Sequence, residues 1–385
     1  MRILEIETFG RGGLIHYAYN LSCALASRGH DVTLVTTVAY ELEGRSLPPN
    51  LRVVKAIGPW TQRIATWPKV LQGIARKLEA ILDAWKVAVL ARRLGPDVVH
   101  IHCTNPVSLV YHVFLRCLGL RLTATAHVVT PHERIGLQSL VYRVVHRSCH
   151  LVIAHSEFDR QRLLNEFAVD QKRTVVIPHG EYGFFASHEH QGADRDAARQ
   201  ALGLAADQQV ALFFGYIREY KGLDLLLEAW PTVQEQQKDT RLVIAGDPVR
   251  LSASRRAELE EQAETVGAVH HFGYVPFEDV ARYFAAADVL VMPYRHISQS
   301  GVLYLALALG VPVLATRVGA LPEMLVDGES AVLVPPESPD ALAEGLLRLF
   351  GDSALRERLA AGGKHVAESH SWPAIAQRTE TAFDK

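Results

Sequence analysis

The chain has 385 residues and a mass of 42.6 kDa, and 49% of its residues are hydrophobic. At roughly 100–200 residues per domain, this length favours two domains of similar size and excludes a small scaffold held by disulfides. The 40 basic and 42 acidic residues nearly balance, so no overall charge excess predicts binding to nucleic acid.

The two halves of the chain nevertheless differ in charge. Residues 1–185 contain 22 Lys and Arg against 14 Asp and Glu, whereas residues 186–385 contain 18 against 28. A basic domain is expected where a protein faces anionic lipid or acidic ligands, but chance and solubility can produce the same asymmetry.

Several features predict a cytoplasmic setting. The four cysteines lack CxxC spacing, and Glu5 and Glu7 interrupt the apolar run at the start of the chain. The longest nearly apolar stretch, residues 302–315, contains Gly310 and Pro312 and is too short to span a bilayer. We therefore expect a protein that is at most peripheral to a membrane.

Short apolar runs rich in β-branched residues alternate with segments of helical period along the whole chain, which predicts an α/β fold with parallel sheets. In the first half these runs lie at 2–7, 31–37, 52–56, 97–101, 122–127, 151–155 and 174–178. In the second half they lie at 209–214, 241–246, 269–272, 288–292, 311–316 and 331–334. This order predicts two successive doubly wound domains.

The polar stretch at 180–207, with one short helix expected near 195–202, is interpreted as the connection between the domains. The expected organisation is a first domain at 1–185, a second at 186–370 and a C-terminal helix at 371–385 that crosses back to the first domain. Because ligands bind at the carboxyl ends of strands in such sheets, we expect an active site in the cleft between the two domains.

A glycine turn follows the first strand, where Gly10, Gly12 and Gly13 precede a helix that ends near Gly29. Such a turn lets backbone amides approach phosphate or sugar oxygens. Its spacing is not that of a dinucleotide-binding loop, and the strand at 31–37 ends without an acid to hold a ribose, so nicotinamide binding is not expected. A tight turn without a ligand is the alternative.

His127 lies at the tip of the strand at 122–127. A histidine there can donate to a sugar hydroxyl or buffer a proton, although a structural hydrogen-bonding role is commoner. The same caution applies to four other histidines: His100, His102, His155 and His179. None has zinc-ligand spacing with a carboxylate or thiolate, and the acidic pair Asp194 and Asp196 falls in the polar linker, so no metal site is expected.

Arg218 and Lys221 lie in the loop after the strand at 209–214 and just before an amphipathic helix. Two cations at a strand end suit a diphosphate, because each makes charge-assisted hydrogen bonds to phosphate oxygens. A solvated basic loop is the alternative.

A second loop leads through Gln299 and Ser300 into an uncharged helix expected at 301–309. The turn formed by Gln299, Ser300, Gly301 and Val302 presents amides and side-chain donors suited to an anion. Capping of the helix by Ser300 is the competing account.

Residues 63–93 form a basic amphipathic segment, in which seven Lys and Arg are interleaved with apolar residues at helical spacing. Such a helix can lie in an anionic membrane interface. The alternative is an ordinary helix that packs its apolar face on the sheet.

As a set, these motifs resemble the retaining glycosyltransferases of family 4, which have the GT-B fold of two Rossmann-like domains facing a central cleft. The similarity covers nearly the whole chain. It comprises the glycine turn, His127, IPHG at 177–180, KG at 221–222 and the sequence GVPVLATRVGALPE at 310–323.

The resemblance implies transfer of a sugar from a nucleotide-sugar donor to an acceptor, without a metal or another cofactor. The first domain would bind a saccharide, glycolipid or small-molecule acceptor, and the second domain would bind the nucleotide. His127 would orient the donor sugar, and Gly12 and Gly13 would admit the sugar and diphosphate. Arg218 and Lys221 would neutralise the departing diphosphate.

The chain departs from the family pattern at two places. The usual Arg of the pattern lies two positions before Arg218, where this chain has Tyr216. The paired glutamates E-x7-E fall on Ile297 and Leu305. Because the second glutamate ordinarily holds the ribose, a variant loop with the sequence QSGV at 299–302 is the expected substitute.

Two other functions remain open from the sequence. A GT-B epimerase or phosphorylase would normally show further acidic residues or a cofactor lysine, which we do not find. A catalytically inactive GT-B binding protein is consistent with the missing glutamates. Thermal stabilisation by nucleotide sugars and their slow hydrolysis would distinguish an enzyme from an inert scaffold.

Overall fold

The computed structural model describes residues 1–58, 67–102, 108–127, 138–181 and 194–384. The chain forms two compact units, one of Met1–Gly180 with Ser371–Lys385 and one of Glu181–His370. The units divide after Gly180, whereas the boundary expected after residue 185 lies outside the described residues. Each unit is built on one parallel sheet.

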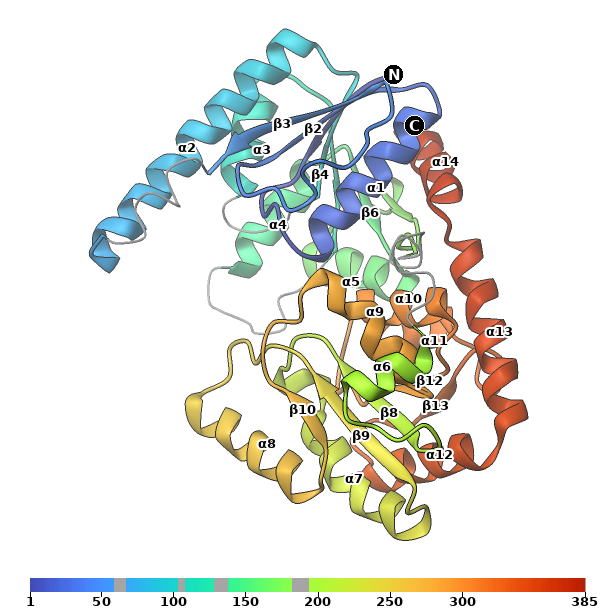
Figure 1. Ribbon diagram of the computed structural model, residues 1–385. Helices are drawn as coiled ribbons and strands as arrows, with labels where there is room; N and C mark the ends of the chain where they lie inside the picture. Colours follow the sequence, from blue (N-terminus) through green and yellow to red (C-terminus); the bar gives the residue numbers. More distant parts are fainter. Residues whose placement is uncertain (59–66, 103–107, 128–137, 182–193, 385) are drawn as a thin grey trace. The chain divides into compact units, whose positions relative to one another are not determined.

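The first unit contains a seven-stranded sheet in the order β3-β2-β1-β4-β5-β6-β7 (Figure 1). The strands are β1 (Arg2–Ile6), β2 (Asp31–Thr37), β3 (Leu51–Ile57), β4 (Val98–Ile101), β5 (Leu122–Thr125), β6 (Leu151–Ala154) and β7 (Thr174–Val176). The strand order reverses between β1 and β4. Loops that follow these two strands therefore leave a crevice at their carboxyl ends, the usual ligand position in doubly wound sheets.

Helices cover both faces of this sheet. On one face α1 (Gly13–Ser27) packs beside α14 (Trp372–Phe383), which brings the C-terminal helix onto the first unit (Figure 1). On the other face lie α2 (Lys69–Leu94) and α3 (Ser108–Cys117). Next along the chain are α4 (Gln138–Ser148) and α5 (Glu157–Phe167). A separate apolar cluster lies between the sheet and the helices on each face. Strands that are buried on both faces in this way carry nearly continuous apolar runs.

The second unit repeats this architecture with six strands in the order β10-β9-β8-β11-β12-β13. They are β8 (Gln209–Phe214), β9 (Thr240–Ala245), β10 (Val269–His271), β11 (Val289–Met292), β12 (Val313–Thr316) and β13 (Val332–Val334). Here the order reverses between β8 and β11, which places the crevice of this unit between the loops that follow those two strands.

The helices of the second unit also form two layers. One face is covered by α6 (Arg195–Ala201), α9 (Phe277–Ala286) and α10 (Gly301–Leu309). The opposite face is covered by α7 (Leu223–Gln236) and α12 (Pro339–Gly351). The remaining helices are α8 (Ala253–Thr265), α11 (Leu321–Met324) and α13 (Ser353–Ser369). Asp194 caps α6 by accepting a hydrogen bond from the amide of Asp196, as expected for a helix start.

Every apolar run predicted as a strand forms one, with ends that differ from the prediction by no more than two residues. The uncharged helix predicted at 301–309 is α10, and Leu303 and Tyr304 within it are fully buried. The α/β fold predicted from the alternating pattern is thereby confirmed. Among the helices of the described residues, none is both long and apolar enough to cross a membrane.

Candidate active site

The crevice of the second unit collects Arg218, Lys221 and the loop that precedes α10. A buried strand precedes each of the two loops involved, and the strands β8 and β11 are hydrogen-bonded neighbours. Because parallel neighbouring strands end at the same edge, residues 215–222 and 293–300 meet there although they are far apart in the sequence.

Lys221 is buried at this edge, with 6% of its surface exposed. Its Nζ lies 5.5 Å from the centroid of the Tyr294 ring, and a Cβ atom on Gly215 would lie 3.1 Å from Nζ. Burial, followed by the charge of Arg218, lowers the pKa of Lys221 to about 7. Gly215 therefore leaves room for the Lys221 amine. An anion bound beside this amine would raise its pKa and favour the charged form.

Arg218 is half-buried three residues earlier in the chain. Its guanidinium makes no hydrogen bond or ion pair with any residue that the structure describes, and its Nε is buried. The acids that follow it in the sequence are paired with other residues, because Glu219 pairs with Arg255 and Asp224 pairs with Arg255 and Arg295. Two cations without a carboxylate partner among the described residues therefore lie close together, an arrangement that suits an anion.

The first turn of α10 reaches the same place. A Cβ atom on Gly215 would lie 3.0 Å from Cγ2 of Val302, so Val302 and Lys221 converge on this glycine. Ser300 makes no side-chain cap to α10, and its Oγ lies 3.4 Å from the Tyr294 hydroxyl oxygen. Capping of α10 by the Ser300 side chain, the alternative considered above, is therefore wrong.

Gln299 adds a further donor to this turn. Its Oε1 accepts a hydrogen bond from the Tyr304 hydroxyl at 3.4 Å, while its buried Nε2 has no partner within the described ranges. Together the loop and the two cations present more hydrogen-bond donors than acceptors, a composition that suits a diphosphate.

Ile297 and Leu305 occupy the positions of the family's paired glutamates and belong to the apolar core of this unit. They are 6% and 4% exposed and pack in the cluster between the sheet and α10. No carboxylate stands at either position, and the polar groups beside them are those of Gln299 and Ser300.

In the first unit the glycine turn lies at the end of β1. Gly10 and Gly12 have φ of +70° and +75°, and a Cβ on Gly10 would lie 2.0 Å from Oγ1 of Thr37. These positions therefore require glycine. The amide of Gly12 donates to Oε1 of Glu41 at 2.8 Å, and the amide of Gly10 donates to Glu7 at 2.8 Å. The Gly10 and Gly12 amides are therefore already hydrogen-bonded and are not available to a ligand. Gly13 begins α1 directly after it.

His127 lies two residues beyond β5 and belongs to a group of histidines at the same edge of the sheet. Its Nδ1 is 3.1 Å from Nε2 of His155, and Nδ1 of His155 is 3.0 Å from the carbonyl oxygen of Ile177. Burial is the main cause that lowers the pKa values of both histidines, so both are neutral. A carbonyl can only accept, so His155 donates to Ile177 and His127 donates to His155.

This chain of hydrogen bonds fixes the tautomer of His127. Its proton is on Nδ1, and Nε2 carries a lone pair without a hydrogen-bond partner in the part of the chain that the structure describes. In this tautomer Nε2 of His127 can only accept a hydrogen bond, whereas the place of His127 at a strand tip predicted a donor to a sugar hydroxyl or a proton buffer.

Two of the other histidines form a separate buried network. His102 Nε2 is 2.5 Å from Oε2 of Glu5, and the two ring nitrogens of His100 lie 2.7 and 2.9 Å from the hydroxyls of Thr123 and Thr125. Burial raises the pKa of Glu5 to about 7. These residues act as hydrogen-bonding groups beneath the crevice.

Sequence reasoning missed Gly215, Tyr294 and Glu41, which contact the expected site residues. Their signal is weak, because a tyrosine or a glycine after a buried strand is common. The position one or two residues after β8 or β11 is the one feature that could have singled out Gly215 and Tyr294.

Two family models match this chain, one in each unit. Residues 11–180 match the domain described as Glycosyltransferase Family 4, and residues 208–352 match Glycosyl transferases group 1. A D-inositol 3-phosphate glycosyltransferase of Streptomyces bingchenggensis is 31% identical over 97% of this chain and 84% of its own length. An uncharacterized glycosyltransferase of Methanocaldococcus jannaschii is 26% identical over 97% of this chain and 94% of its own length.

The fold has a close counterpart among solved structures. Anabaena HepE, in complex with UDP and glucose, superposes with a TM-score of 0.79 over the full length of both chains at 18% sequence identity. The two doubly wound units and the domain matches define a GT-B glycosyltransferase. Within that class the chain belongs to the family 4 glycosyltransferases, and the fold and family predicted from the sequence are confirmed.

Proposed function

We propose that this glycosyltransferase transfers a sugar from a nucleotide-sugar donor to a saccharide, glycolipid or small-molecule acceptor, with retention of anomeric configuration and without a metal ion. The observation that supports it best is the pair Arg218 and Lys221, which has no carboxylate partner among the described residues and lies at the crevice of the second unit. The solved Anabaena HepE complexes contain UDP and UDP-glucose, which favours a donor of this class.

In this proposal the second unit binds the donor and the first unit binds the acceptor. The acceptor hydroxyl attacks the anomeric carbon on the face from which the diphosphate departs, and its proton passes to the leaving diphosphate oxygen. Arg218, Lys221 and the amides at Gly301 and Val302 stabilise the negative charge that grows on the diphosphate. The QSGV loop replaces the donor contacts of the family's glutamates.

A stability screen tests this proposal directly. UDP-, GDP-, dTDP- and ADP-linked sugars are added to the protein, and thermal unfolding and donor hydrolysis are measured. A donor at about 100 times its Kd should add about 2.7 kcal/mol to the free energy of unfolding. An inactive binding protein, the alternative with which Ile297 and Leu305 are consistent, would show no hydrolysis with any donor. An inert scaffold would show neither effect.

His127→Ala is expected to lower the turnover of donor hydrolysis more than it weakens donor binding. The reason is that Nε2 of His127 would hold the reacting sugar mainly near the transition state. His100→Ala is the control, because both ring nitrogens of His100 are bonded to threonine hydroxyls. Parallel losses of stability and turnover in His127→Ala would instead identify a structural core histidine.

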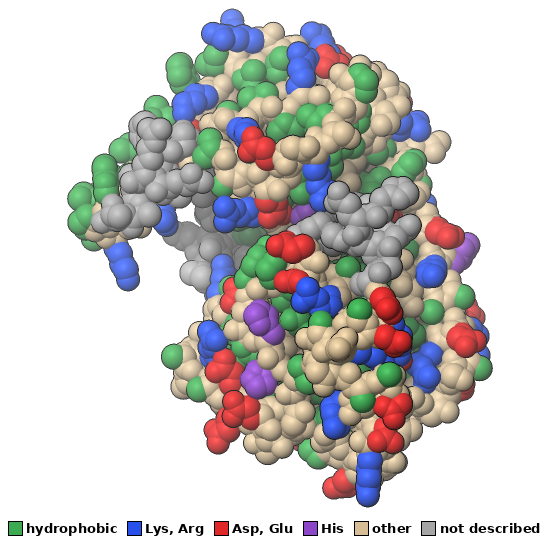
Figure 2. Space-filling model, viewed as in Figure 1, with side chains coloured by type: hydrophobic (Ala, Val, Ile, Leu, Met, Phe, Trp, Pro, Cys, Tyr) green, Lys and Arg blue, Asp and Glu red, His purple; other side chains and the backbone are tan. Residues whose placement is uncertain are grey.

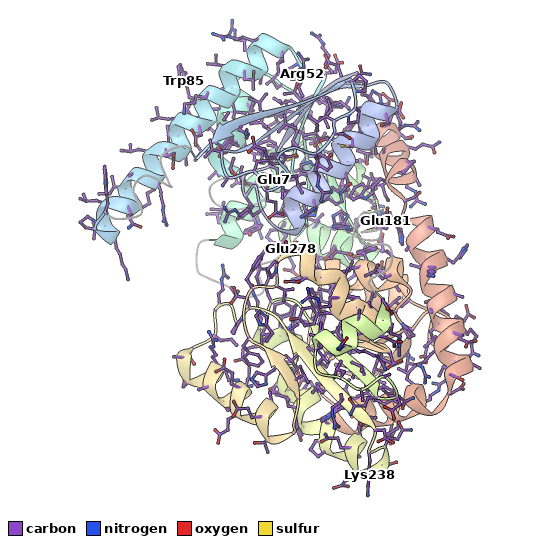
Figure 3. The ribbon with its side chains drawn as sticks, viewed as in Figure 1. Glu7, Arg52, Trp85, Glu181, Lys238 and Glu278 are labelled. Carbon is purple, nitrogen blue, oxygen red and sulfur yellow. The ribbon has the colours of Figure 1, made fainter. Side chains whose placement is uncertain are left out.

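We further propose that α2 attaches the protein to the inner face of an anionic membrane, as a peripheral cytoplasmic enzyme of cell-surface polysaccharide or glycolipid assembly. The apolar stripe of the predicted segment faces away from the sheet: Ile81 is 44% and Trp85 is 55% exposed. Trp85 projects outward from α2 (Figure 3), and hydrophobic side chains gather along this helix (Figure 2). Residues 63–66 of the segment lie outside the described residues.

The buried face of α2 is a different one. Ala84, Val87 and Ala91 pack on the sheet, so the exposed stripe is not needed for folding. The exposed members of the stripe are Trp67, Val70, Leu71, Ile74, Leu78, Ile81, Leu82 and Trp85. Basic residues accompany them, with Arg92 and Arg93 in the last turn, and this combination is typical of interfacial helices.

The protein is expected to float with phosphatidylglycerol vesicles at low salt and to float less with neutral vesicles. Ile74→Glu and Leu78→Glu should each weaken vesicle binding about tenfold or more, because each buried apolar side chain contributes roughly 1.5–3 kcal/mol. Val326→Glu is the matched control, since Val326 is also exposed, at 55%, but belongs to the second unit. Absence of wild-type flotation would refute the membrane proposal.

A further inference from the structure

We propose that His155 is a positioning residue for the transfer reaction: it holds His127 in the tautomer whose Nε2 accepts a hydrogen bond. This inference rests on the proposed function, in which His127 orients the reacting sugar. The sequence by itself favours a structural role for His155, because the two histidines are far apart in the chain. They meet because β5 and β6 are hydrogen-bonded neighbours in the sheet.

The backbone fixes the place of His155. His155 directly follows β6, and Ile177 directly follows β7. The amide of Ile177 donates to the carbonyl oxygen of Ala154 at 2.9 Å, and the amide of Ala126 donates to the carbonyl oxygen of Ile153 at 2.9 Å. These hydrogen bonds continue the parallel ladders beyond the strand ends, so the segments on both sides of His155 are held in register with it.

Both ring nitrogens of His155 are engaged. Its Nδ1 lies 3.0 Å from the carbonyl oxygen of Ile177, and its Nε2 lies 3.1 Å from Nδ1 of His127. Because the carbonyl can only accept, Nδ1 of His155 carries the hydrogen and Nε2 carries the lone pair. The residue is 2% exposed, so both hydrogen bonds are shielded from solvent. His155 therefore acts on a substrate through His127 and not by direct contact.

This relay decides what His127 can bind. Which ring nitrogen of a neutral imidazole carries the proton depends on the hydrogen bond that the other nitrogen makes. With Nδ1 of His127 donating to His155, Nε2 of His127 is an acceptor, and it has no hydrogen-bond partner in the described part of the chain. Without His155 the proton of His127 could move to Nε2. The sugar hydroxyl would then lose its acceptor, and the reacting sugar would be oriented less well.

Packing holds the two rings in place independently of this hydrogen bond. The ring of Tyr17, a buried residue of α1, makes edge contacts with the rings of His127 and His155 at centroid distances of 4.5 and 5.3 Å. A substitution at position 155 is therefore expected to change the tautomer of His127 with little movement of its ring. A purely structural role of His155 predicts the opposite, which is a loss of stability without a change of tautomer.

The tautomer is measured by long-range ¹H–¹⁵N NMR at neutral pH on the full-length protein labelled with ¹⁵N-histidine, without any donor. The His127→Ala spectrum identifies the signals of His127. In the wild type we expect a protonated Nδ1 and an unprotonated Nε2. His155→Leu, which removes both ring nitrogens, should give a protonated Nε2 at His127. His155→Gln keeps an acceptor at the ε position and should preserve the wild-type tautomer. His146→Gln is the matched control, because His146 is fully buried on α4.

Donor hydrolysis provides the second measurement. His155→Leu should lower kcat by about tenfold or more with a smaller change in the Kd of the donor, and His155→Gln should recover most of the loss. A wild-type spectrum with a protonated Nε2 at His127 would overturn the proposal. So would folded His155→Leu protein with the wild-type tautomer or the wild-type kcat. Absence of hydrolysis in a wild type that shows the expected tautomer would refute the transferase function and leave the relay confirmed.

Discussion

Arg218→Ala and Lys221→Ala should each lower the kcat/KM of donor hydrolysis by about ten- to a hundredfold. A charge-assisted hydrogen bond to phosphate contributes roughly 1.5–3 kcal/mol, and each 1.4 kcal/mol corresponds to about a tenfold change. Because charge on the diphosphate grows as the sugar leaves, part of the loss should appear in kcat. Arg218→Lys should be more active than Arg218→Ala but less active than the wild type, because a lysine ammonium cannot make the two parallel hydrogen bonds that a guanidinium makes to phosphate.

Folding should be little affected by these changes. Lys221 is buried without a carboxylate partner among the described residues, so its removal takes away a desolvated amine and no ion pair. Lys238→Ala is the control, because Lys238 is an exposed cation of the same unit (Figure 3). A folded double variant of Arg218 and Lys221 that hydrolyses the donor at the wild-type rate would refute the assignment of the diphosphate to this crevice.

Donor binding is expected to weaken as the pH rises above about 7. In the free protein, burial and the charge of Arg218 lower the pKa of Lys221 to about 7. A bound diphosphate favours the charged amine and raises that pKa, so binding takes up a proton above pH 7. The Kd should therefore increase by up to about tenfold per pH unit, or roughly a hundredfold between pH 6 and pH 9.

Isothermal titration of a nucleotide sugar measures both the Kd and the proton uptake, the latter from buffers with different ionisation enthalpies. Lys221→Arg is the control, because a guanidinium stays charged across this range and should remove most of the pH dependence. A wild-type Kd that is constant from pH 6 to pH 9 would show that Lys221 does not contact the diphosphate.

The sequence alone determined the strands, the buried helix α10 and the position of Arg218 and Lys221 at a strand end. These features depend on local sequence patterns: the periodicity of hydrophobic residues, runs of β-branched residues, and glycine and proline at the ends of helices and strands. Gly10, Gly12 and the loop after β8 could be identified in the same way, because each lies in a loop that follows an apolar run.

The tertiary structure decided which of these residues meet. Strand order brings Lys221 and Val302 to Gly215 and the Tyr294 ring to Lys221, and it places the histidines that follow β5, β6 and β7 at one edge. The helical periodicity of α2 predicted an apolar stripe but did not show whether this stripe packs on the sheet or faces solvent. In the structure the alanine-rich face packs on the sheet, and the stripe of large apolar residues is exposed. Contacts between distant segments depend on the sheet order and on which helix face is covered, and neither is encoded in the local periodicity of one segment.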